Sequence, residues 1–289
     1  MILCERYQFD ILAGDVEAAF MQGDVQHGDQ ELYFHQPKEG LPGLEPHTLI
    51  KILKGVFGLA TAPRQWWRKL RRLLEAVVLH DASGKPCHFR QHPLDPAFFY
   101  CHSSIGYVMA IAVVHVDDLL MGFDREAPKA KKAMHDLLPW GDWRELPFTF
   151  CGKSAFRNDK GELCLSQVDY ARTIDPIEIP KSRRASPEVS ATTMEVQDNR
   201  SALGALGWLA TQSRPDLAAN VATSQRNQAN PTVGDLIETN RIIKLARTHA
   251  ESCLVIPRLT GKLALVTLHD ASWAHVDEED NTGILNYVK

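Results

Sequence analysis

The sequence predicts an α+β fold, in which an antiparallel sheet backed by helices is followed by a mainly helical region. Residues 95–123 form short apolar runs separated by turns, which is typical of consecutive antiparallel strands. Residues 63–78 carry apolar side chains at helical spacing, and residues 200–228 and 233–250 indicate two further helices. A chain of 289 residues with a hydrophobic share of 44% is long and apolar enough to bury a core.

The first part of the chain is expected to hold three strands and a basic helix. The strands are predicted at residues 6–12, 31–36 and 48–52, and Asp15 should lie near the end of the first one. Pro63 suits the first turn of the helix that follows. The polar faces of this helix are rich in arginine and lysine: Arg64, Arg68, Lys69, Arg71 and Arg72.

Two adjacent carboxylates, Asp117 and Asp118, interrupt an apolar stretch at the expected tip of a hairpin, VVHVDDLLMG. Charges beside apolar side chains are costly unless a cation or hydrogen bonds offset them. Together with Asp15 they offer hard oxygen ligands, which suit Mg²⁺, with Mn²⁺ as an alternative ion. The competing interpretation is a solvated Asp-Asp turn.

The second part of the chain is expected to change character after a polar break, PKSRRASPEVSATT. Before the break, a helix is predicted at residues 127–138 and a hairpin turns at residues 158–161. The predicted domains are residues 1–185, a helical region over residues 186–260, and a final segment over residues 261–289.

Composition limits the possible partners and compartments. Acidic residues outnumber basic ones by 36 to 32, so nucleic-acid binding must rely on a local basic patch. The six cysteines form no C-x-x-C pair, which favours free thiols in an intracellular compartment, cytoplasm or nucleus. The apolar run at residues 107–116 is much shorter than the ~20 residues of a membrane helix, so no membrane partner is expected.

Five segments resemble, in sequence order, the motifs of copia-type retrotransposon reverse transcriptases. They are DVEAAFMQGD at residues 15–24, ELYFHQPKEG at 31–40, KILKGVFGLATAPRQWW at 51–67, DPAFFY at 95–100 and VVHVDD at 113–118. Further on, ALGALGWLATQSRPDLAANVA at residues 202–222 resembles the connection segment of that family. LVTLHDASWAH at residues 265–275 resembles the opening strand of its ribonuclease H domain.

The resemblance implies a fragment of a pol polyprotein with the activity of an RNA-directed DNA polymerase. Residues 1–185 would be the palm with partial fingers, residues 186–260 the thumb and connection, and residues 261–289 a truncated ribonuclease H start. Asp15, Asp117 and Asp118 would be the catalytic carboxylates that bind the metal ions. The implied partners are an RNA or DNA template-primer, deoxynucleoside triphosphates and other segments of the polyprotein.

The resemblance also implies substrate-binding roles for Phe20, Gly58, Pro63 and His115. Phe20 would pack under the incoming sugar, and Gly58 to Pro63 would lie against the nascent base pair. His115 replaces the aromatic residue of the family motif, and its alternative is a satisfied core histidine. The basic helix would contact nucleic-acid phosphates through Arg64, Arg68, Arg71 and Arg72, or else be a solvated surface. Asp270 would be a vestigial ribonuclease H carboxylate.

Other hypotheses stay open at this point. Only fourteen residues precede Asp15, so the basic fingers segment of the family is expected to be missing, and a catalytically inactive remnant that at most binds nucleic acid is the alternative function. An unrelated metal-dependent phosphohydrolase would also use these carboxylates. Five further residues form a weak candidate zinc site: Cys87, His88, His92, Cys101 and His102.

Overall fold

The computed structural model describes residues 1–25, 31–125, 127–262 and 264. The chain divides into two compact units, Met1–Arg258 and Leu259–Lys289. In the second unit the described residues, 259–262 and 264, form no helix or strand. The sequence prediction of a ribonuclease H start, including Asp270, therefore lies almost entirely outside the described residues.

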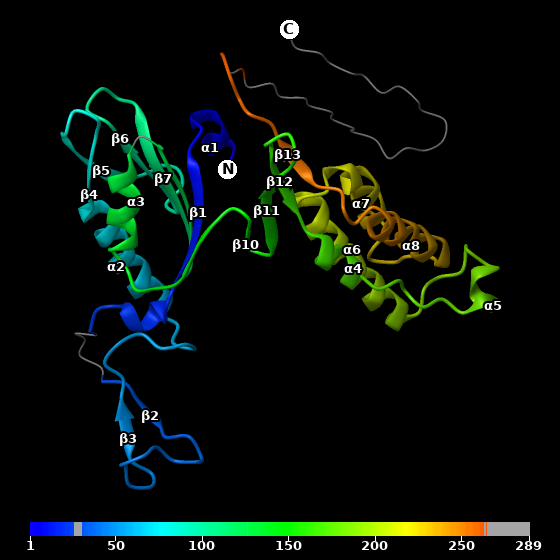
Figure 1. Ribbon diagram of the computed structural model, residues 1–289. Coiled ribbons are helices and arrows are strands. Elements are labelled where there is room, and N and C mark those ends of the chain that lie inside the picture. Colours follow the sequence, from blue (N-terminus) through cyan, green and yellow to red (C-terminus); the bar gives the residue numbers. More distant parts are fainter. Residues whose placement is uncertain (26–30, 126, 263, 265–289) are drawn as a thin grey trace. The chain divides into compact units, whose positions relative to one another are not determined.

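A seven-stranded antiparallel sheet forms the centre of the first unit, with the order β4-β5-β6-β7-β8-β1-β9 (Figure 1). Its strands are β1 (Asp10–Val16), β4 (Val78–His80), β5 (Pro86–Gln91), β6 (Phe98–His102), β7 (Val108–His115), β8 (Asp118–Phe123) and β9 (Trp140–Glu145). The three strands predicted over residues 95–123 are confirmed as β6, β7 and β8. The first strand begins later than predicted, because residues 2–7 form the helix α1 (Ile2–Tyr7).

One face of this sheet is covered by α2 (Ala62–Ala76) and α3 (Pro128–His135). The apolar stripe of α2 supplies Trp66, Leu70 and Leu74, each at most 1% exposed, and they pack against strand residues such as Leu12 and Met121. The basic side chains of α2 remain on the other faces of the helix. The amphipathic helix predicted from residue spacing is therefore confirmed, and its apolar face anchors it to the sheet.

The opposite face packs against a second antiparallel sheet of four strands, in the order β10-β11-β12-β13. These strands are β10 (Phe148–Phe150), β11 (Lys153–Arg157), β12 (Leu163–Ser166) and β13 (Leu254–Ile256). Ile11, Leu120 and Phe148 belong to the shared apolar cluster. The carboxylate of Glu5, 1% exposed, accepts two hydrogen bonds from the guanidinium of Arg157 at 2.7 and 3.2 Å. This buried pair ties α1 to β11.

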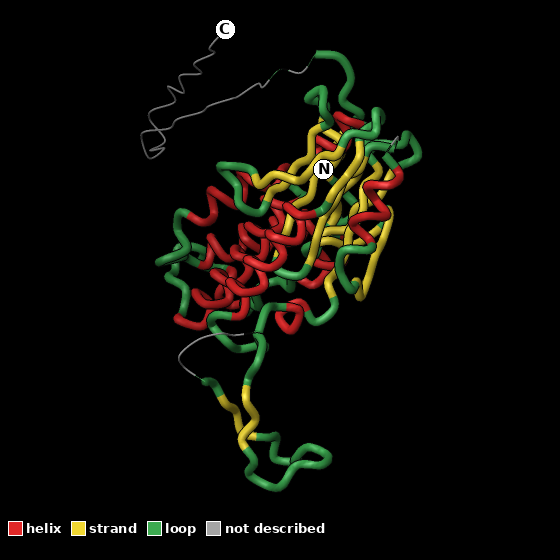
Figure 2. Tube along the Cα trace, turned by 90° about the vertical axis from the view of Figure 1, so that its left-hand side faces the viewer, coloured by secondary structure: helices red, strands yellow, loops and turns green. Residues whose placement is uncertain are grey.

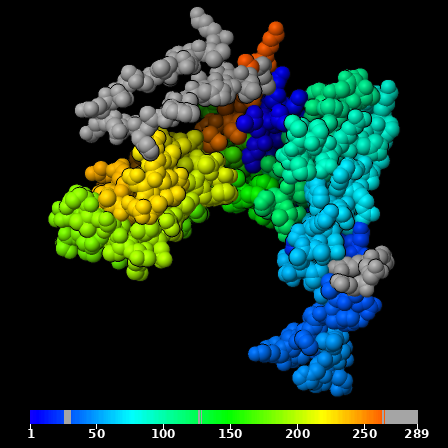
Figure 3. Space-filling view, turned by 180° about the vertical axis from the view of Figure 1, so that it is seen from behind, coloured from blue at the N-terminus to red at the C-terminus, as the bar shows by residue number. Residues whose placement is uncertain are grey.

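The helical region has its own core, made by residues such as Leu206, Leu236 and Ile243. Its elements are α4 (Val168–Thr173), α5 (Lys181–Arg184), α6 (Thr193–Gln212), η2 (Pro215–Leu217), α7 (Ala218–Gln225) and α8 (Val233–Thr248). Figure 2 shows these helices in red, and Figure 3 shows the same part of the chain in space-filling form, coloured from light green to orange. The helix predicted at residues 200–228 is broken after α6, where Pro215 lacks the backbone N–H that would continue it.

Arg214, in the RPD sequence at this break, is 2% exposed. Its guanidinium donates two hydrogen bonds to Asp216, at 2.7 and 2.9 Å, and one to the carbonyl of His249 at 2.7 Å. His249 is the C-cap of α8, so the arginine satisfies a carbonyl at a helix end. The RPD sequence thus has a structural role, which is to hold α6, η2 and α8 together.

A separate two-stranded sheet is formed by β2 (Tyr33–His35) and β3 (Leu49–Lys51). Both strands were predicted within a residue or two of these bounds. Large side chains of this hairpin are exposed, including Phe34 and Leu49. Within the part of the chain that the structure describes, no helix is long and apolar enough to span a membrane.

Candidate active site

A single row of polar side chains crosses four neighbouring strands of the large sheet. In the strand register, His115 of β7 is opposite Asp118 of β8, and Asp118 is opposite Asp15 of β1. Asp15 is in turn opposite Asp142 of β9. Directly opposite residues of antiparallel strands project from the same face and are close neighbours. The structure therefore brings Asp15 and Asp118 together, as the sequence analysis expected.

The alternation of side chains along β1 shows which face of the seven-stranded sheet carries this row. In β1, Ile11 and Ala13 belong to the cluster shared with the small sheet, whereas Leu12 and Val16 pack toward the helices. Asp15 continues the first set, because successive side chains alternate between the two faces of a strand. The row thus stands at the end of the face that the small sheet covers.

Asp117 lies in the two-residue turn that joins β7 to β8, beside Val116. Val116 adopts φ 59°, a left-handed conformation that is costly for a β-branched residue. Two hydrogen bonds hold the turn: the indole N–H of Trp66 donates to the Val116 carbonyl at 2.7 Å, and the backbone N–H of Val16 donates to the Asp117 carbonyl at 3.0 Å. The buried side of α2 therefore fixes the turn that carries the carboxylate.

Asp142 is a fourth carboxylate, which the sequence analysis missed. The register of β9 against β1 shifts between Asp15 and Val16, so that Gly141 is the extra residue of a β-bulge. Because of this bulge, Trp140 and Trp143 both pack toward the helices although they are three residues apart. The bulge interrupts the alternation of apolar and polar residues from which β9 could have been predicted.

Negative charge is concentrated in this row. Burial raises the pKa of Asp15, and the charges of Asp117, Asp118 and Asp142 raise it further. Burial and the charge of Asp117 also raise the pKa of Asp118, against the opposing effect of His115. The guanidinium of Arg144 opposes both shifts, but it is ion-paired with Asp142. A divalent cation at the row would offset this repulsion.

The chain is 27% identical over 296 residues to the retrovirus-related Pol polyprotein from transposon RE1 of Arabidopsis thaliana, an alignment that covers 95% of the chain. It is 25% identical over 260 residues, 83% of the chain, to the corresponding polyprotein from transposon TNT 1-94 of Nicotiana tabacum. A putative transposon Ty5-1 protein of Saccharomyces cerevisiae is 24% identical over 273 residues, 89% of the chain.

The chain is similar to retrotransposon Pol polyproteins over most of its length. The resemblance expected from the motifs is therefore confirmed. No family model matches the chain. The chain spans only 18% of the RE1 and TNT 1-94 polyproteins, but 82% of the Ty5-1 protein.

Three residues with a predicted substrate-binding role, Phe20, Gly58 and Pro63, lie in η1, in the loop before α2 and in the first turn of α2. Phe20 is half-buried in η1 (Ala19–Gln22), and its ring packs edge-on against that of Phe57 at a centroid distance of 4.9 Å. Gly58 adopts φ 88°, a conformation that favours glycine, and Pro63 is exposed in the first turn of α2. The contact between Phe20 and Phe57 thus joins η1 to the loop that precedes the basic helix.

The four arginines of the predicted nucleic-acid patch are all exposed, but they differ in their partners. Arg71 is ion-paired with Glu75 at 2.9 Å and Arg72 is ion-paired with Asp24. Among the described residues, Arg64 and Arg68 have no ion pair with an acidic side chain. Arg64 and Arg68 are therefore the two positions of the predicted patch with the most available charge.

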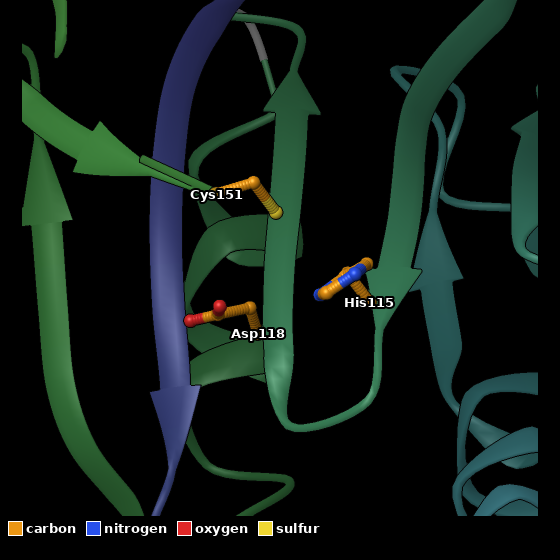
Figure 4. Close-up of side chains that lie close together, drawn as sticks. All are labelled: His115, Asp118 and Cys151. Atoms are coloured by element: carbon orange, nitrogen blue, oxygen red, sulfur yellow. The ribbon is translucent and has the colours of Figure 1, made fainter. Parts of the chain in front are cut away.

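A second group of possible metal ligands lies at one end of the row. One ligand atom each of His115, Asp118 and Cys151 lies within 4.8 Å of the other two (Figure 4). Within the described residues, no other group of three His, Cys, Asp or Glu side chains is gathered so closely, so Asp15, Asp117 and Asp118 are more widely spaced. The alternative zinc site suggested around Cys87 and Cys101 was wrong, because the strand register does not bring its histidines and cysteines together.

Proposed function

We propose that this chain is the polymerase part of a retrotransposon Pol protein and catalyses RNA-directed DNA synthesis. The observation that carries the proposal is the register of β1 against β8, in which Asp15 is directly opposite Asp118 and Asp117 is on the adjoining turn. The similarity to Pol polyproteins over most of the chain supports the same conclusion. The proposed substrates are a primer on an RNA or DNA template and deoxynucleoside triphosphates.

The carboxylates fit Mg²⁺, with Mn²⁺ as the alternative ion. Their ligand atoms are all hard oxygens, which Mg²⁺ prefers. The carboxylates also repel one another, and a cation would offset this repulsion. Three carboxylates offer enough oxygen ligands for two ions about 4 Å apart, as two-metal catalysis requires. When bound, the ions would lower the pKa of the primer hydroxyl and stabilise the charge of the departing pyrophosphate.

Each residue of the proposed active site would have a role that follows from its place in the fold. Asp15 and Asp118 lie on paired strands, so their backbones are held by the sheet, and Asp117 lies on a turn held by Trp66 and Val16. Phe20 would pack against the sugar of the incoming nucleotide. Arg64 and Arg68 would bind primer or template phosphates without reading sequence. Base pairing with the template would choose the nucleotide.

The proposed layout follows from these roles. The seven-stranded sheet with α2 and α3 would be the palm, and the region from α6 to α8 would be the thumb and connection. Other segments of a Pol polyprotein would be its partners.

Primer extension tests the proposal. The chain would be incubated with an RNA template, a labelled DNA primer, deoxynucleotides and Mg²⁺. Extension by the parent, lost in Asp118→Asn and retained in Asp10→Asn, is the expected result. Asp10 is the matched control because it lies in β1, the strand paired with β8, opposite the far end of β8 from Asp118, and is ion-paired with Arg125.

Two outcomes would contradict the proposed function. Extension that survives Asp118→Asn would remove the carboxylate from the mechanism. No extension by the parent, with template-primer binding that Arg64→Ala and Arg68→Ala weaken, would instead support the inactive remnant that only binds nucleic acid.

A further inference from the structure

Three side chains that commonly bind transition metals meet beside the proposed polymerase site. His115 ends β7, Asp118 begins β8, and Cys151 lies in the turn between β10 and β11. A nitrogen, an oxygen and a sulfur, one from each residue, lie within 4.8 Å of one another. Figure 4 shows the imidazole of His115 and the sulfur of Cys151 directed toward β8, the strand that carries Asp118.

We propose that His115, Asp118 and Cys151 form a binding site for a thiophilic divalent cation of the zinc class, which competes with Mg²⁺ for Asp118. The existence of this site does not depend on the proposed function. Its inhibitory effect on polymerisation does.

The donor set selects the ion. Thiolate and imidazole ligands favour zinc and other late transition metals, whereas Mg²⁺ prefers oxygen ligands. Zinc sites with three protein ligands keep a fourth position for water, and their bond lengths place neighbouring ligand atoms about 3.3 to 3.6 Å apart in a tetrahedron. Ligand atoms that lie within 4.8 Å of one another would move closer by side-chain rotation to reach this geometry.

The backbone of Cys151 also has an unusual conformation. Cys151 and Gly152 form the two-residue turn between the paired residues Phe150 and Lys153, and both have positive φ, 47° and 71°. This is the pattern of a type I′ turn, in which Asn and Gly are the preferred residues. A left-handed conformation is unfavourable for a cysteine, because its Cβ approaches the following carbonyl oxygen. Such strain is commonly kept where the side chain has a function.

The site is also accessible and balanced in charge. His115 is exposed, and Asp118 and Cys151 are half-buried, so an ion can enter from solvent. Binding would release the thiol proton to solvent, and the thiolate and the carboxylate would together offset the two positive charges of the ion. An ion held there would occupy Asp118 and so remove one ligand from the magnesium site of the proposed polymerase.

Cobalt binding to the full chain tests the site directly. Co²⁺ is the probe, because a cobalt–thiolate bond produces a charge-transfer band in the near ultraviolet, which does not depend on polymerase activity. The reduced parent should bind Co²⁺ with this band, and Zn²⁺ should displace it. Cys151→Gly should abolish the band, and His115→Ala should weaken Co²⁺ binding by at least about tenfold.

Cys151→Gly is chosen because glycine suits the left-handed turn, so the variant should fold at least as well as the parent. Cys253→Ser is the matched control: its thiol is also half-buried, but it lies beside Cys164. No thiolate band in the parent, or a band that Cys151→Gly leaves unchanged, would overturn the proposal. A band lost in Cys253→Ser would overturn it as well, by assigning the ion to the Cys164 and Cys253 pair.

A primer-extension assay separates the site from the proposed function. If the chain is a polymerase, micromolar Zn²⁺ should inhibit the parent more strongly than Cys151→Gly, and excess Mg²⁺ should relieve the inhibition. A thiolate band without any polymerase activity would leave the metal site standing and contradict the proposed function alone. Equal inhibition of the parent and Cys151→Gly by Zn²⁺ would contradict the proposal that the bound ion competes with Mg²⁺ for Asp118.

Discussion

Replacing Asp15 by Asn should stabilise the protein in the absence of divalent cations. Asp15 is opposite a carboxylate on each side, Asp118 on β8 and Asp142 on β9. Like charges directly opposite each other in a sheet cost about 0.2–1 kcal/mol per pair. Since Arg144 offsets part of the charge of Asp142, we expect a gain of about 1 kcal/mol, which corresponds to roughly 2–4 °C in Tm for a domain of this size.

The sign of the pH dependence follows from the raised pKa of Asp15. A carboxylate whose pKa is higher in the folded than in the unfolded protein stabilises the fold below its unfolded pKa. This contribution is lost as the pH rises through the folded value. The advantage of Asp15→Asn should therefore be present at neutral pH and vanish at a pH below the ordinary pKa of aspartate.

Thermal and urea unfolding with EDTA, at neutral and acidic pH, measure this difference. Asp10→Asn is the control: it lies in the same strand, but it loses an ion pair with Arg125 instead of a repulsion, so it should not raise Tm. Added Mg²⁺ should stabilise the parent more than Asp15→Asn. A variant that is less stable than the parent at neutral pH, or a gain that persists in acid, would refute the reasoning.

Three further substitutions test the contacts that hold the site and its supports. Trp66→Phe removes the indole hydrogen bond to the turn of the Asp pair and should cost about 1–2 kcal/mol in urea unfolding, whereas an unchanged midpoint would show that the bond contributes nothing. Arg157→Met leaves the buried carboxylate of Glu5 unpaired and should cost about 3–5 kcal/mol, much of which the added substitution Glu5→Leu should recover; no recovery would locate the loss elsewhere. Arg214→Met should cost about 3 kcal/mol and speed hydrogen exchange at the end of α8, and normal exchange there would contradict its capping role.

Elements with a strong local period were predicted well. The helix α2 follows from apolar residues at helical spacing, and the strands β6 to β8 follow from short apolar runs between turns. Local patterns were misleading where another interaction competed. The predicted strand at residues 6–12 overlaps the helix α1, whose residue Glu5 is held by Arg157 from far along the chain.

Some residues of the candidate site were predicted from local sequence, and others were missed. Asp15, Asp117 and Asp118 were predicted because each lies at an expected strand end, in a short segment that resembles a motif of copia-type reverse transcriptases. Asp142 was missed because the bulge at Gly141 disturbs the alternation of β9. Cys151 was missed because its proximity to His115 depends on how the small sheet packs against the large one.

The sequence by itself determined the α+β class and the basic helix, because both depend on residue types at short spacing, and it marked Asp15, Asp117 and Asp118 as candidate metal ligands through short motifs. Only the tertiary structure decided the strand register, which sets Asp118 opposite Asp15 and brings Asp142 and Cys151 to the same end of the sheet. Register depends on hydrogen bonds and side-chain packing between strands that are distant in the chain. No local pattern contains that information.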